Sequence, residues 1–234
     1  YVRGGGADEN LYLLDGNPVY HVNHLLGFFS AFNPDAIKNT RFYKGSFPAE
    51  YGGRLSSVVD VRMNDGNRQE YHGNISVGLL SARANLEGPI VKDRSSFNVS
   101  VRRTWLDLIT GTALAVVNKN SSIKDVFGYH FFDINAKLNH SFSDRSRAYL
   151  SFYMGQDAFR QGSKEKNGDS EDMFLWRWGN LIGSAGWNYV FGQKLFGNLM
   201  VGYSRFRSHI RQEVGGYEIY AGKEGKESFK RESY

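Results

Sequence analysis

Two stretches of the sequence carry side chains that bind metal ions in other proteins. The segment His21-Val22-Asn23-His24 offers two imidazoles, but no third ligand follows at a recognisable spacing, so a polar tip of a folded domain is the competing interpretation. Glu165, Asp169, Glu171 and Asp172 offer the carboxylates that calcium prefers, without EF-hand spacing, so a solvated loop is the alternative there. The chain has no cysteine, which excludes disulfides, thiolate zinc sites and cysteine nucleophiles.

Catalytic patterns are the weakest signal in the sequence. No Ser-His-Asp or paired-carboxylate arrangement is local enough to propose chemistry, and no Lys-Ser or Lys-Thr follows Gly4-Gly5-Gly6 to make a phosphate-binding loop. The 29 basic and 24 acidic residues give a charge of +5, but the basic residues are spread out and form no stripe for nucleic acid. We therefore expect neither an enzyme nor a nucleic-acid binder, and no bound cofactor or metal.

Residues 67–234 show the period-two alternation of β-strands. In 132–142 the side chains of Phe132, Ile134, Ala136, Leu138 and Phe142 share one face, and polar residues take the other. The same pattern recurs in several further segments, and the full set of expected strands is 73–79, 84–90, 97–105, 132–142, 148–157, 181–191 and 195–203. This count of seven requires a tight bend near Ser81-Ala82.

The connections between these strands alternate in length. Short turns at 92–94, 143–145 and 192–194 alternate with long polar segments at about 107–129, 158–172 and 210 onward. Short turns at one end and long loops at the other are typical of outer-membrane β-barrels. Such barrels average out to hydrophilic, as the mean hydropathy of −0.48 does here, and no apolar run reaches the ~18–20 residues of a spanning helix.

Aromatic residues gather near the ends of the expected strands. They are Trp105, Phe142, Trp176, Trp178, Tyr189, Phe191 and Tyr203. Interfacial girdles of a membrane barrel are the favoured interpretation, and core aromatics of a soluble barrel are the alternative.

The first 66 residues are organised differently. Leu11–Leu14, Asp15-Gly16 and Val19-Tyr20 predict a hairpin, and Asn33-Pro34 predicts a capped short helix. A turn cluster at Asn64–Asn67 separates this section from the strands. Because the chain opens at Tyr1 without Met or a signal peptide, we expect it to be the interior of a longer protein.

Long strings of residues are similar to those of a known family. Segments 2–6, 10–20, 33–37 and 42–61 (Phe-Tyr-Lys-Gly-Ser-Phe-Pro-Ala-Glu-Tyr-Gly-Gly-Arg and onward) resemble the plug domain of TonB-dependent outer-membrane transporters, most closely those of Bacteroidota. Leu86–Ile90 and Arg102–Asp107 resemble the first barrel strands of the same group.

The resemblance implies a mainly β chain. Residues 1–66 would be the C-terminal part of an α+β plug domain, and residues 67–234 the first ~7 antiparallel strands of a 22-stranded transmembrane barrel. The implied function is a receptor that binds a scarce nutrient at the cell surface and imports it with energy transmitted by TonB, the plug acting as gate. A soluble β-rich binding module is the alternative.

The resemblance also implies roles for particular residues. Arg3 and Lys44 would lock the plug by pairing with barrel carboxylates. The plug motif would comprise Gly4, Gly5, Asp15, Gly16, Gly45, Tyr51, Gly52, Gly53 and Arg54, whose glycines allow close approach inside a lumen. An apex would comprise Tyr20, His21, Phe28, Phe29 and Phe32, either facing substrate or buried within the plug.

The partners follow from the same resemblance. They are TonB, through a segment outside this chain, membrane lipid, a small nutrient such as a siderophore, peptide, cobalamin or sugar, and, as a further candidate, a surface lipoprotein. The implied location is the outer membrane of a Gram-negative bacterium.

Overall fold

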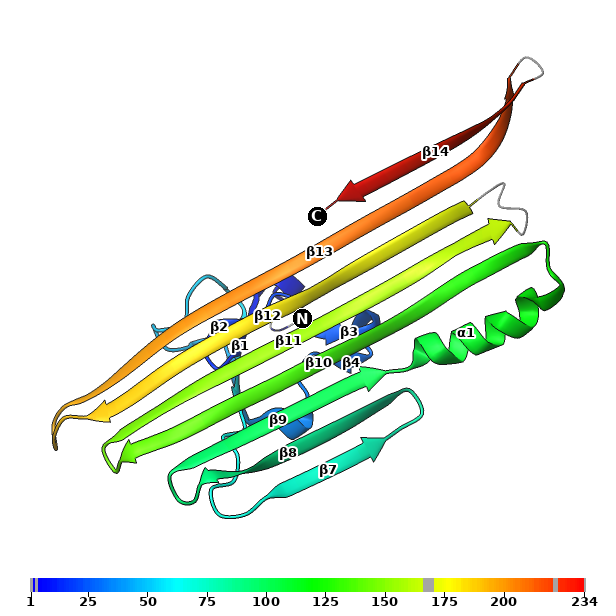
Figure 1. The fold of residues 1–234 in the computed structure, drawn as a ribbon. Helices are drawn as coiled ribbons and strands as arrows, with labels where there is room; N and C mark the ends of the chain where they lie inside the picture. Colours follow the sequence, from blue (N-terminus) through cyan, green and yellow to red (C-terminus); the bar gives the residue numbers. More distant parts are fainter. Residues whose placement is uncertain (1, 3, 166–170, 221–222, 234) are drawn as a thin grey trace.

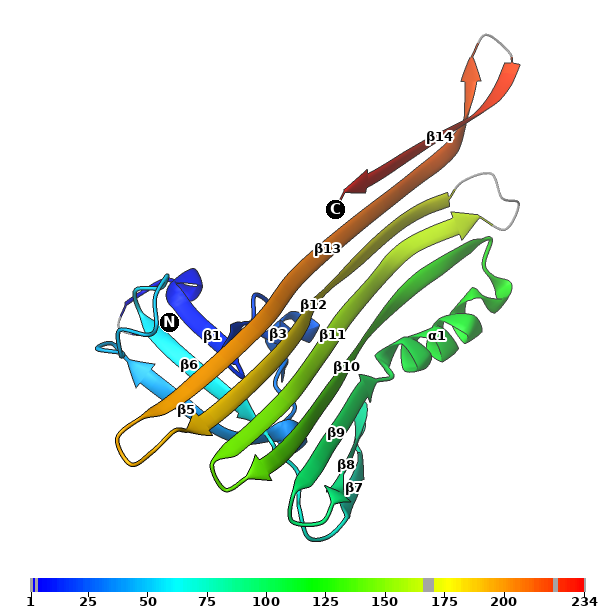
Figure 2. The same ribbon diagram turned by 60° about the vertical axis from the view of Figure 1, so that its left-hand side comes forward.

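The chain forms a long curved antiparallel sheet with a smaller β-rich unit packed on one of its faces (Figure 1). The computed structural model describes residues 2, 4–165, 171–220 and 223–233. Figure 2 shows the smaller unit, blue to cyan, on one side of the curved sheet. The prediction of a mainly β chain with antiparallel strands is confirmed.

The smaller unit, here called the small unit, is built from short elements. In chain order they are η1 (Ala7–Glu9), β1 (Asn10–Leu14), β2 (Asn17–Pro18), β3 (Asn23–His24), η2 (Leu25–Gly27), β4 (Phe29–Ser30), η3 (Pro34–Ala36), β5 (Ile37–Lys44) and β6 (Ser57–Met63). The strand order of its main sheet is β2-β1-β6-β5, with β1 and β6 parallel, while β3 and β4 form a separate hairpin.

Two predicted local structures in the small unit are confirmed. Asp15 and Gly16 both have positive φ, 46° and 84°, as a two-residue type I′ turn between β1 and β2 requires. Asn33 caps η3, its Oδ1 accepting from the N–H of Asp35 at 3.2 Å, and Pro34 occupies the first position of that turn.

The large sheet is a meander of consecutive strands, here called the wall. Its elements are β7 (His72–Val77), β8 (Ser81–Val91), β9 (Ser95–Thr104), α1 (Leu106–Val117), η4 (Asn118–Asn120), β10 (Ile123–Ser143), β11 (Ser146–Glu165), β12 (Glu171–Val190), β13 (Phe196–Tyr220) and β14 (Lys223–Ser233). Each strand pairs with the next in sequence, and the expected break near Ser81 is confirmed, since the N–H of Gly78 donates to Ser81 O at 2.8 Å.

The strand count and the long segments differ from expectation. Within the described residues the wall has eight strands, not seven, because β13 continues to Tyr220 and β14 follows where a loop was expected. Segment 158–172 is mostly strand as well, since β11 ends at Glu165 and β12 begins at Glu171. Backbone hydrogen bonds extend a strand pair without any need for apolar alternation, so the polar strand ends left no period-two signal.

The prediction of a polar loop at about 107–129 was also wrong. It contains α1, in which Leu and Ala favour a helix and Asp107 lies in the favourable first turn. No helix among the described residues combines the length and the apolar character needed to cross a membrane. The three short turns at 92–94, 143–145 and 192–194 lie between strands as expected, all at the end opposite α1 (Figure 1).

The two faces of the wall have inverted polarity. On β10 the side chains of Asp133, Asn135 and Lys137 are buried beneath the small unit, while Leu138 on the opposite face is 46% exposed. The pattern holds across the neighbouring strands: the buried set includes Ser96, Asn98, Ser100, Arg102, Asp157, Asn180 and Ser184, and the exposed set includes Val99, Val101, Leu150, Phe152, Leu199 and Val201. On β9 to β13 the apolar side of the strands thus faces away from the small unit.

The aromatic residues divide between these faces. Phe142, Phe191 and Tyr203 are exposed, as a girdle requires. Trp178 is buried, and Trp176 packs with it against Tyr129 and Phe131 under the small unit. The girdle assignment is therefore wrong for these two tryptophans, because their even-numbered positions on β12 point inward with Asn180.

Candidate functional site

The interface between the small unit and the wall holds a buried network centred on His24. His24 lies on β3 and is 2% exposed. Its Nδ1–H donates to Asp157 Oδ2 on β11 at 2.6 Å, and its Nε2 lies 3.7 Å from Asp133 Oδ2 on β10. The imidazole also stacks on the ring of Phe131, with centroids 4.2 Å apart. One side chain of the small unit therefore contacts two carboxylates of the wall.

Arg102 on β9 completes this network from the other side. Its Nε and Nη2 donate to Asp133 Oδ2 at 2.7 and 2.6 Å, and Nη2 also donates to the backbone oxygen of Ser30 on β4 at 2.7 Å. Arg102 thus neutralises the buried Asp133 and, at the same time, binds the small unit directly.

The backbone after His24 is fixed by a tyrosine of the wall. The N–H of Leu25 donates to the Tyr129 hydroxyl at 2.5 Å, and that hydroxyl donates in turn to Asp157. We call His24, Arg102, Tyr129, Asp133 and Asp157 the latch. Its members come from β3 and from three consecutive strands of the wall, β9 to β11.

A second charged cluster lies nearer the short-turn end. Lys137 Nζ on β10 lies 3.3 Å from Asp15 Oδ1 and 3.1 Å from Asp65 Oδ1, and donates to Met63 O at 3.1 Å. Asp15 also accepts from the N–H of Met63 at 3.1 Å, and Lys38 lies 2.5 Å from Asp65. Burial raises the pKa of Asp65, but the hydrogen bonds and charges of Lys38 and Lys137 outweigh it, so the net pKa is lowered.

Further polar contacts extend along the interface. Arg83 on β8 lies 3.0 Å from Asp35, and Asn33 Nδ2 donates to Ser100 Oγ at 2.8 Å. The hydroxyl of Ser204 on β13 donates to Pro18 O at 2.5 Å. Apolar contact occurs in two parts of the interface. Tyr153 and Ile182 of the wall join the core of the small unit, and Leu25 and Phe29 of the small unit pack against the buried cluster of Tyr129, Phe131 and Trp178.

His21 lies beside the latch, and its ring acts as a hydrogen-bond acceptor. The Nε1–H of Trp178 donates to His21 Nε2 at 2.9 Å, and Asn180 Nδ2 donates to His21 O at 2.7 Å. Burial lowers the pKa of His21, and the nearby His24 adds to this effect, while Asp157 opposes it. The geometry and the lowered pKa agree on a neutral imidazole.

The predicted apex residues divide into two groups. Tyr20 and Phe28 are exposed, at 58% and 85%. Phe29 packs on Phe131 with centroids 5.4 Å apart, and Phe32 packs against the core of the small unit. Contact of these residues and His21 with a substrate stays a prediction.

Of the two predicted lock residues, the structure describes only Lys44. Arg3 lies outside the described residues. Lys44 is exposed on β5, where its Nζ lies 5.4 Å from the centroid of the Phe42 ring, and no ion pair of Lys44 occurs within the part of the chain that the structure describes. Their pairing with barrel carboxylates stays a prediction.

The plug-motif residues occupy turns and strand ends of the small unit. Gly4, Gly16, Gly45 and Gly53 have positive φ, and Gly5 packs so closely on Ser56 that a Cβ would lie 2.7 Å from its side chain. Tyr51 donates to Asp60 Oδ2 at 3.4 Å, while Gly52 and Arg54 are exposed. Close approach therefore occurs at Gly5, whereas a Cβ on Gly4, Gly52 or Gly53 would have no neighbour within 4 Å among the described residues.

The metal hypotheses find no geometric support in the residues described. No group of three His, Asp or Glu side chains among them is placed to hold a metal ion. Of the acidic segment, residues 166–170 lie outside the described residues, and Glu171 pairs with Lys164 at 2.9 Å.

Sequence reasoning missed the latch and Lys137, although part of the signal was present. Arg102 and Asp133 both lie on the polar faces of predicted strands, and they are directly opposed in the β9–β10 register. Charged residues on one face of adjacent strands indicate a polar interior. The alternation of side chains alone identified this face only as the hydrophilic one.

Comparisons with known proteins identify neighbours in structure only. No family model matches the chain, and no curated protein matches it. Among solved structures the chain is similar to the siderophore receptor PirA from Acinetobacter baumannii (TM-score 0.45, 16% identity, 94% of this chain and 39% of that one). A mutant of the ferric enterobactin receptor PfeA from Pseudomonas aeruginosa has a TM-score of 0.45 and 14% identity, and the match covers 91% of this chain and 42% of that one. The siderophore receptor PirA from Pseudomonas aeruginosa has a TM-score of 0.41 and 16% identity, and the match covers 99% of this chain and 51% of that one. The chain thus spans about two fifths to one half of these receptors.

Proposed function

We propose that this chain is part of a TonB-dependent receptor of the Bacteroidota type in the outer membrane of a Gram-negative bacterium. Residues 1–66 would form the latter part of the plug, and residues 67–234 a part of the barrel wall. The receptor would bind a small nutrient, such as a siderophore, peptide, cobalamin or sugar, at the cell surface and import it with energy from TonB. Its role would be transport and not catalysis.

The inverted polarity of the wall carries this proposal. A soluble sheet buries its apolar face, because each buried Leu or Phe side chain contributes about 1.5–3 kcal/mol. Here the small unit covers the polar face, and the apolar side chains of β9 to β13 are exposed. That arrangement is stable when lipid covers the apolar face and the polar face lines a filled lumen.

The dimensions of the apolar face agree with a membrane. On β10 it runs from Phe132 to Phe142, and the ten steps between these residues, at about 3.3 Å each, span ~33 Å along the strand. At the ~40° tilt of a barrel strand this corresponds to ~25 Å of height, the thickness of the apolar band of outer-membrane barrels.

The polar interface supports a gating role for the small unit. The latch and Lys137 bind it to the wall through hydrogen bonds and ion pairs that water can replace when the unit moves. In this proposal Arg3 and Lys44 make further contacts with parts of the barrel beyond residue 234, and the apex residues face the nutrient.

Topology is the first test of this proposal. In the full-length protein, Ser122→Cys places a thiol just after η4, and Asp144→Cys places one in a short turn. A membrane-impermeant maleimide on intact cells should label the Ser122→Cys variant, and should label the Asp144→Cys variant only after the outer membrane is permeabilised. Equal labelling of both variants, or recovery of the protein in the soluble fraction, would refute the barrel and favour the soluble binding module.

A reversible tether tests the gate. The Cγ of Asn17 on β2 lies 2.5 Å from where a Cβ on Gly202 of β13 would sit. With a bond of about 1.5 Å to the Asn17 Cβ, the two Cβ atoms lie within ~4 Å, which suits a disulfide. A strain that lacks this protein should not regain growth on the imported nutrient when it carries the Asn17→Cys and Gly202→Cys double variant. A reductant that breaks the disulfide should restore this growth.

The single-cysteine variants are the controls for the tether, because each keeps one substitution without the bond. Both should rescue growth with or without reductant. Uptake that continues through a fully oxidised double variant would show that the small unit does not move during transport.

A further inference from the structure

The outward face of the wall carries arginines where its apolar part ends toward α1. Arg177 lies on β12, Arg205 and Arg207 on β13, and Arg160 on β11, and all four are exposed. Their strand neighbours point to the small unit: Trp178 contacts His21, and Ser204 donates to Pro18. Alternation therefore directs the arginines to the opposite face, the one that bears the apolar side chains.

The strand register places this group directly beside the apolar face. Arg205 is opposite Leu181, which is opposite Met154, and this row continues through Ile134 to Val101. Two positions farther along β13, Arg207 is opposite Gly179 of β12. Arg177 lies two positions from Gly179 on β12. We call Arg160, Arg177, Arg205 and Arg207 the rim arginines.

A groove of about 300 Å³ lies between three of these arginines and the apolar face. Its lining includes Arg177, Arg205 and Arg207 together with Met154 and Leu181. Gly179 forms part of it, where β11 and β12 approach so closely that a Cβ would lie 3.0 Å from the Cα of Gln156. The groove thus brings cationic and apolar side chains together.

The rim arginines make no ion pair among the described residues, although Asp107 lies beside Arg160. In the described ranges no carboxylate lies within ion-pair distance of the rim arginines, whereas other cations of this face are paired. Arg103 contacts Asp107 at 2.9 Å, and Lys164 contacts Glu171 at 2.9 Å. Within the part of the chain that the structure describes, Arg177, Arg205 and Arg207 thus present three guanidinium groups without an ion-pair partner on one exposed face, which favours an anionic ligand, and their planar donors suit phosphate.

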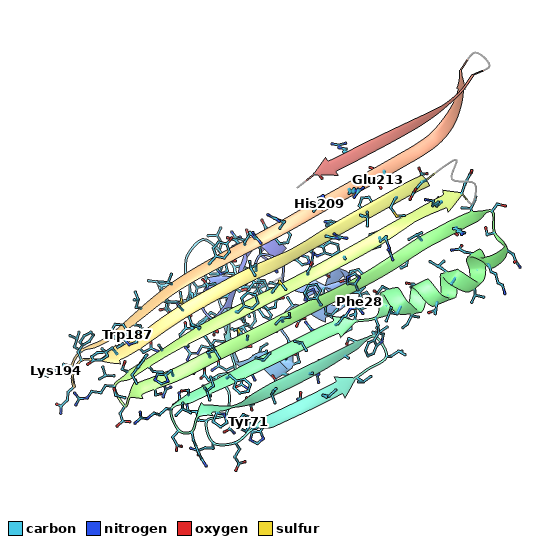
Figure 3. All side chains as sticks on the ribbon, in the orientation of Figure 1. Phe28, Tyr71, Trp187, Lys194, His209 and Glu213 are labelled. Atoms are coloured by element: carbon cyan, nitrogen blue, oxygen red, sulfur yellow. The ribbon has the colours of Figure 1, made fainter. Side chains whose placement is uncertain are left out.

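We propose that the rim arginines bind the phosphorylated headgroup of a membrane lipid. This inference rests on the proposed function, which places lipid against the apolar face. A ligand that fits the groove must offer an anion to Arg177, Arg205 and Arg207 and a hydrocarbon chain to Met154 and Leu181, and a phosphorylated lipid offers both. The rim arginines lie toward the end of the wall that carries α1, away from the short turns. Figure 3 shows His209 and Glu213 of β13 toward this end and Trp187 and Lys194 at the opposite end.

The test uses full-length protein in detergent micelles and two lipids with the same acyl chains. One lipid carries two phosphates on a glucosamine disaccharide, and the other is its dephosphorylated form. Binding is measured by native mass spectrometry for wild type and for the variant with Arg160, Arg177, Arg205 and Arg207 each replaced by Gln. Each cation near a charged lipid contributes about fivefold in affinity, so the variant should lose at least 100-fold for the phosphorylated lipid.

The matched control neutralises four exposed cations at the other end of the wall. Lys92→Gln, Arg94→Gln, Arg145→Gln and Lys194→Gln remove the same charge, and binding should stay within about threefold of wild type. Equal loss in the control, or no loss in the rim variant, overturns the proposal. If the fourfold rim variant does not fold, Arg205→Gln with Arg207→Gln should still lose about 25-fold.

Two further arms separate the possible outcomes. Inorganic phosphate at millimolar concentration should not displace the lipid. Displacement would show a phosphate site to which the apolar residues of the groove do not contribute, and would overturn the lipid assignment. Topology and detergent dependence of the wild type are measured independently. A wild type that is membrane-inserted but indifferent to lipid phosphate refutes this inference alone, while a soluble wild type refutes the proposed function itself.

Discussion

Replacing His24 with alanine removes the side chain by which β3 contacts both Asp133 and Asp157. All three side chains are at most 2% exposed, so water does not substitute freely for the lost contacts. The hydrogen bond to Asp157 contributes about 1.5–3 kcal/mol because its acceptor is charged. The stack on Phe131 adds about 0.5–1.5 kcal/mol.

The variant retains part of the network, which bounds the effect. Asp157 keeps its hydrogen bond from Tyr129, and Asp133 keeps both contacts from Arg102. We therefore expect His24→Ala to weaken attachment of the small unit by about 2–4.5 kcal/mol. At about 1.4 kcal/mol per tenfold, the detached population should rise by roughly 30- to 1,500-fold.

Hydrogen–deuterium exchange of the full-length protein in detergent measures this population. Amides of β1, β5 and β6 should exchange faster in the variant, while those of β10 to β12 should keep their protection. His72→Ala is the matched control, because His72 lies on β7 with its side chain 52% exposed and should change nothing. Unchanged exchange of the small unit in His24→Ala would show that the latch does not hold it, and would refute the reasoning above.

Three other perturbations follow from the charged groups of the small unit. Lys137→Met leaves the carboxylate of Asp15 buried without its cation and should lower the free energy of unfolding of the small unit by about 3–5 kcal/mol, measured by denaturant-dependent exchange. The pKa of Asp65 is lower in the folded state, so this carboxylate stabilises the small unit fully above its unfolded pKa near 4, and the stabilisation is lost as pH falls through the folded pKa. The Asp65→Asn variant should therefore show a weaker pH dependence of the unfolding free energy, measured by hydrogen exchange, in that range. An unchanged pH dependence would contradict this. Arg3→Ala with Lys44→Ala should raise passive leak of small solutes and proteolysis of residues 1–66 without changing nutrient affinity, and a collapse of affinity alone would assign both residues to the binding site.

The fold was predictable to the extent that side chains alternate. Segment 132–142 predicted both the central part of β10 and the division of its faces, because positions covered by the small unit and positions on the exposed face differ in polarity. The ends of the same strands carry polar residues on both faces, as Lys164 and Glu171 show, and alternation disappears there although the backbone pairing continues. The helix α1 was missed because its threonines and glycine interrupt the apolar pattern; Thr110 and Thr112 donate instead to carbonyls one turn earlier.

The candidate site was predictable only on the side of the wall. Arg102, Asp133 and Asp157 lie at positions that alternation assigns to the polar face, so their burial together follows once the strands pair. The contact with His24 does not follow, because it depends on how two separately folded units dock. In the sequence His24 stands beside His21, which suggested a shared metal site, yet the two imidazoles bind different partners, Asp157 and Trp178.

The polarity of the interface determines whether such a unit can leave the wall and return. Separation of an apolar interface exposes hydrocarbon to water at about 25 cal/mol per Å², and that cost cannot be recovered by solvation. Separation of the latch exposes Arg102, Asp133 and Asp157, which water hydrates well, so the net cost is only the difference between protein and water hydrogen bonds. Two apolar clusters also cross the interface, one with Tyr153 and Ile182 and one with Phe131 and Trp178, and their burial favours return. In the proposed function, an interface of this mixed composition would hold the small unit at rest and allow its release when a force acts on it.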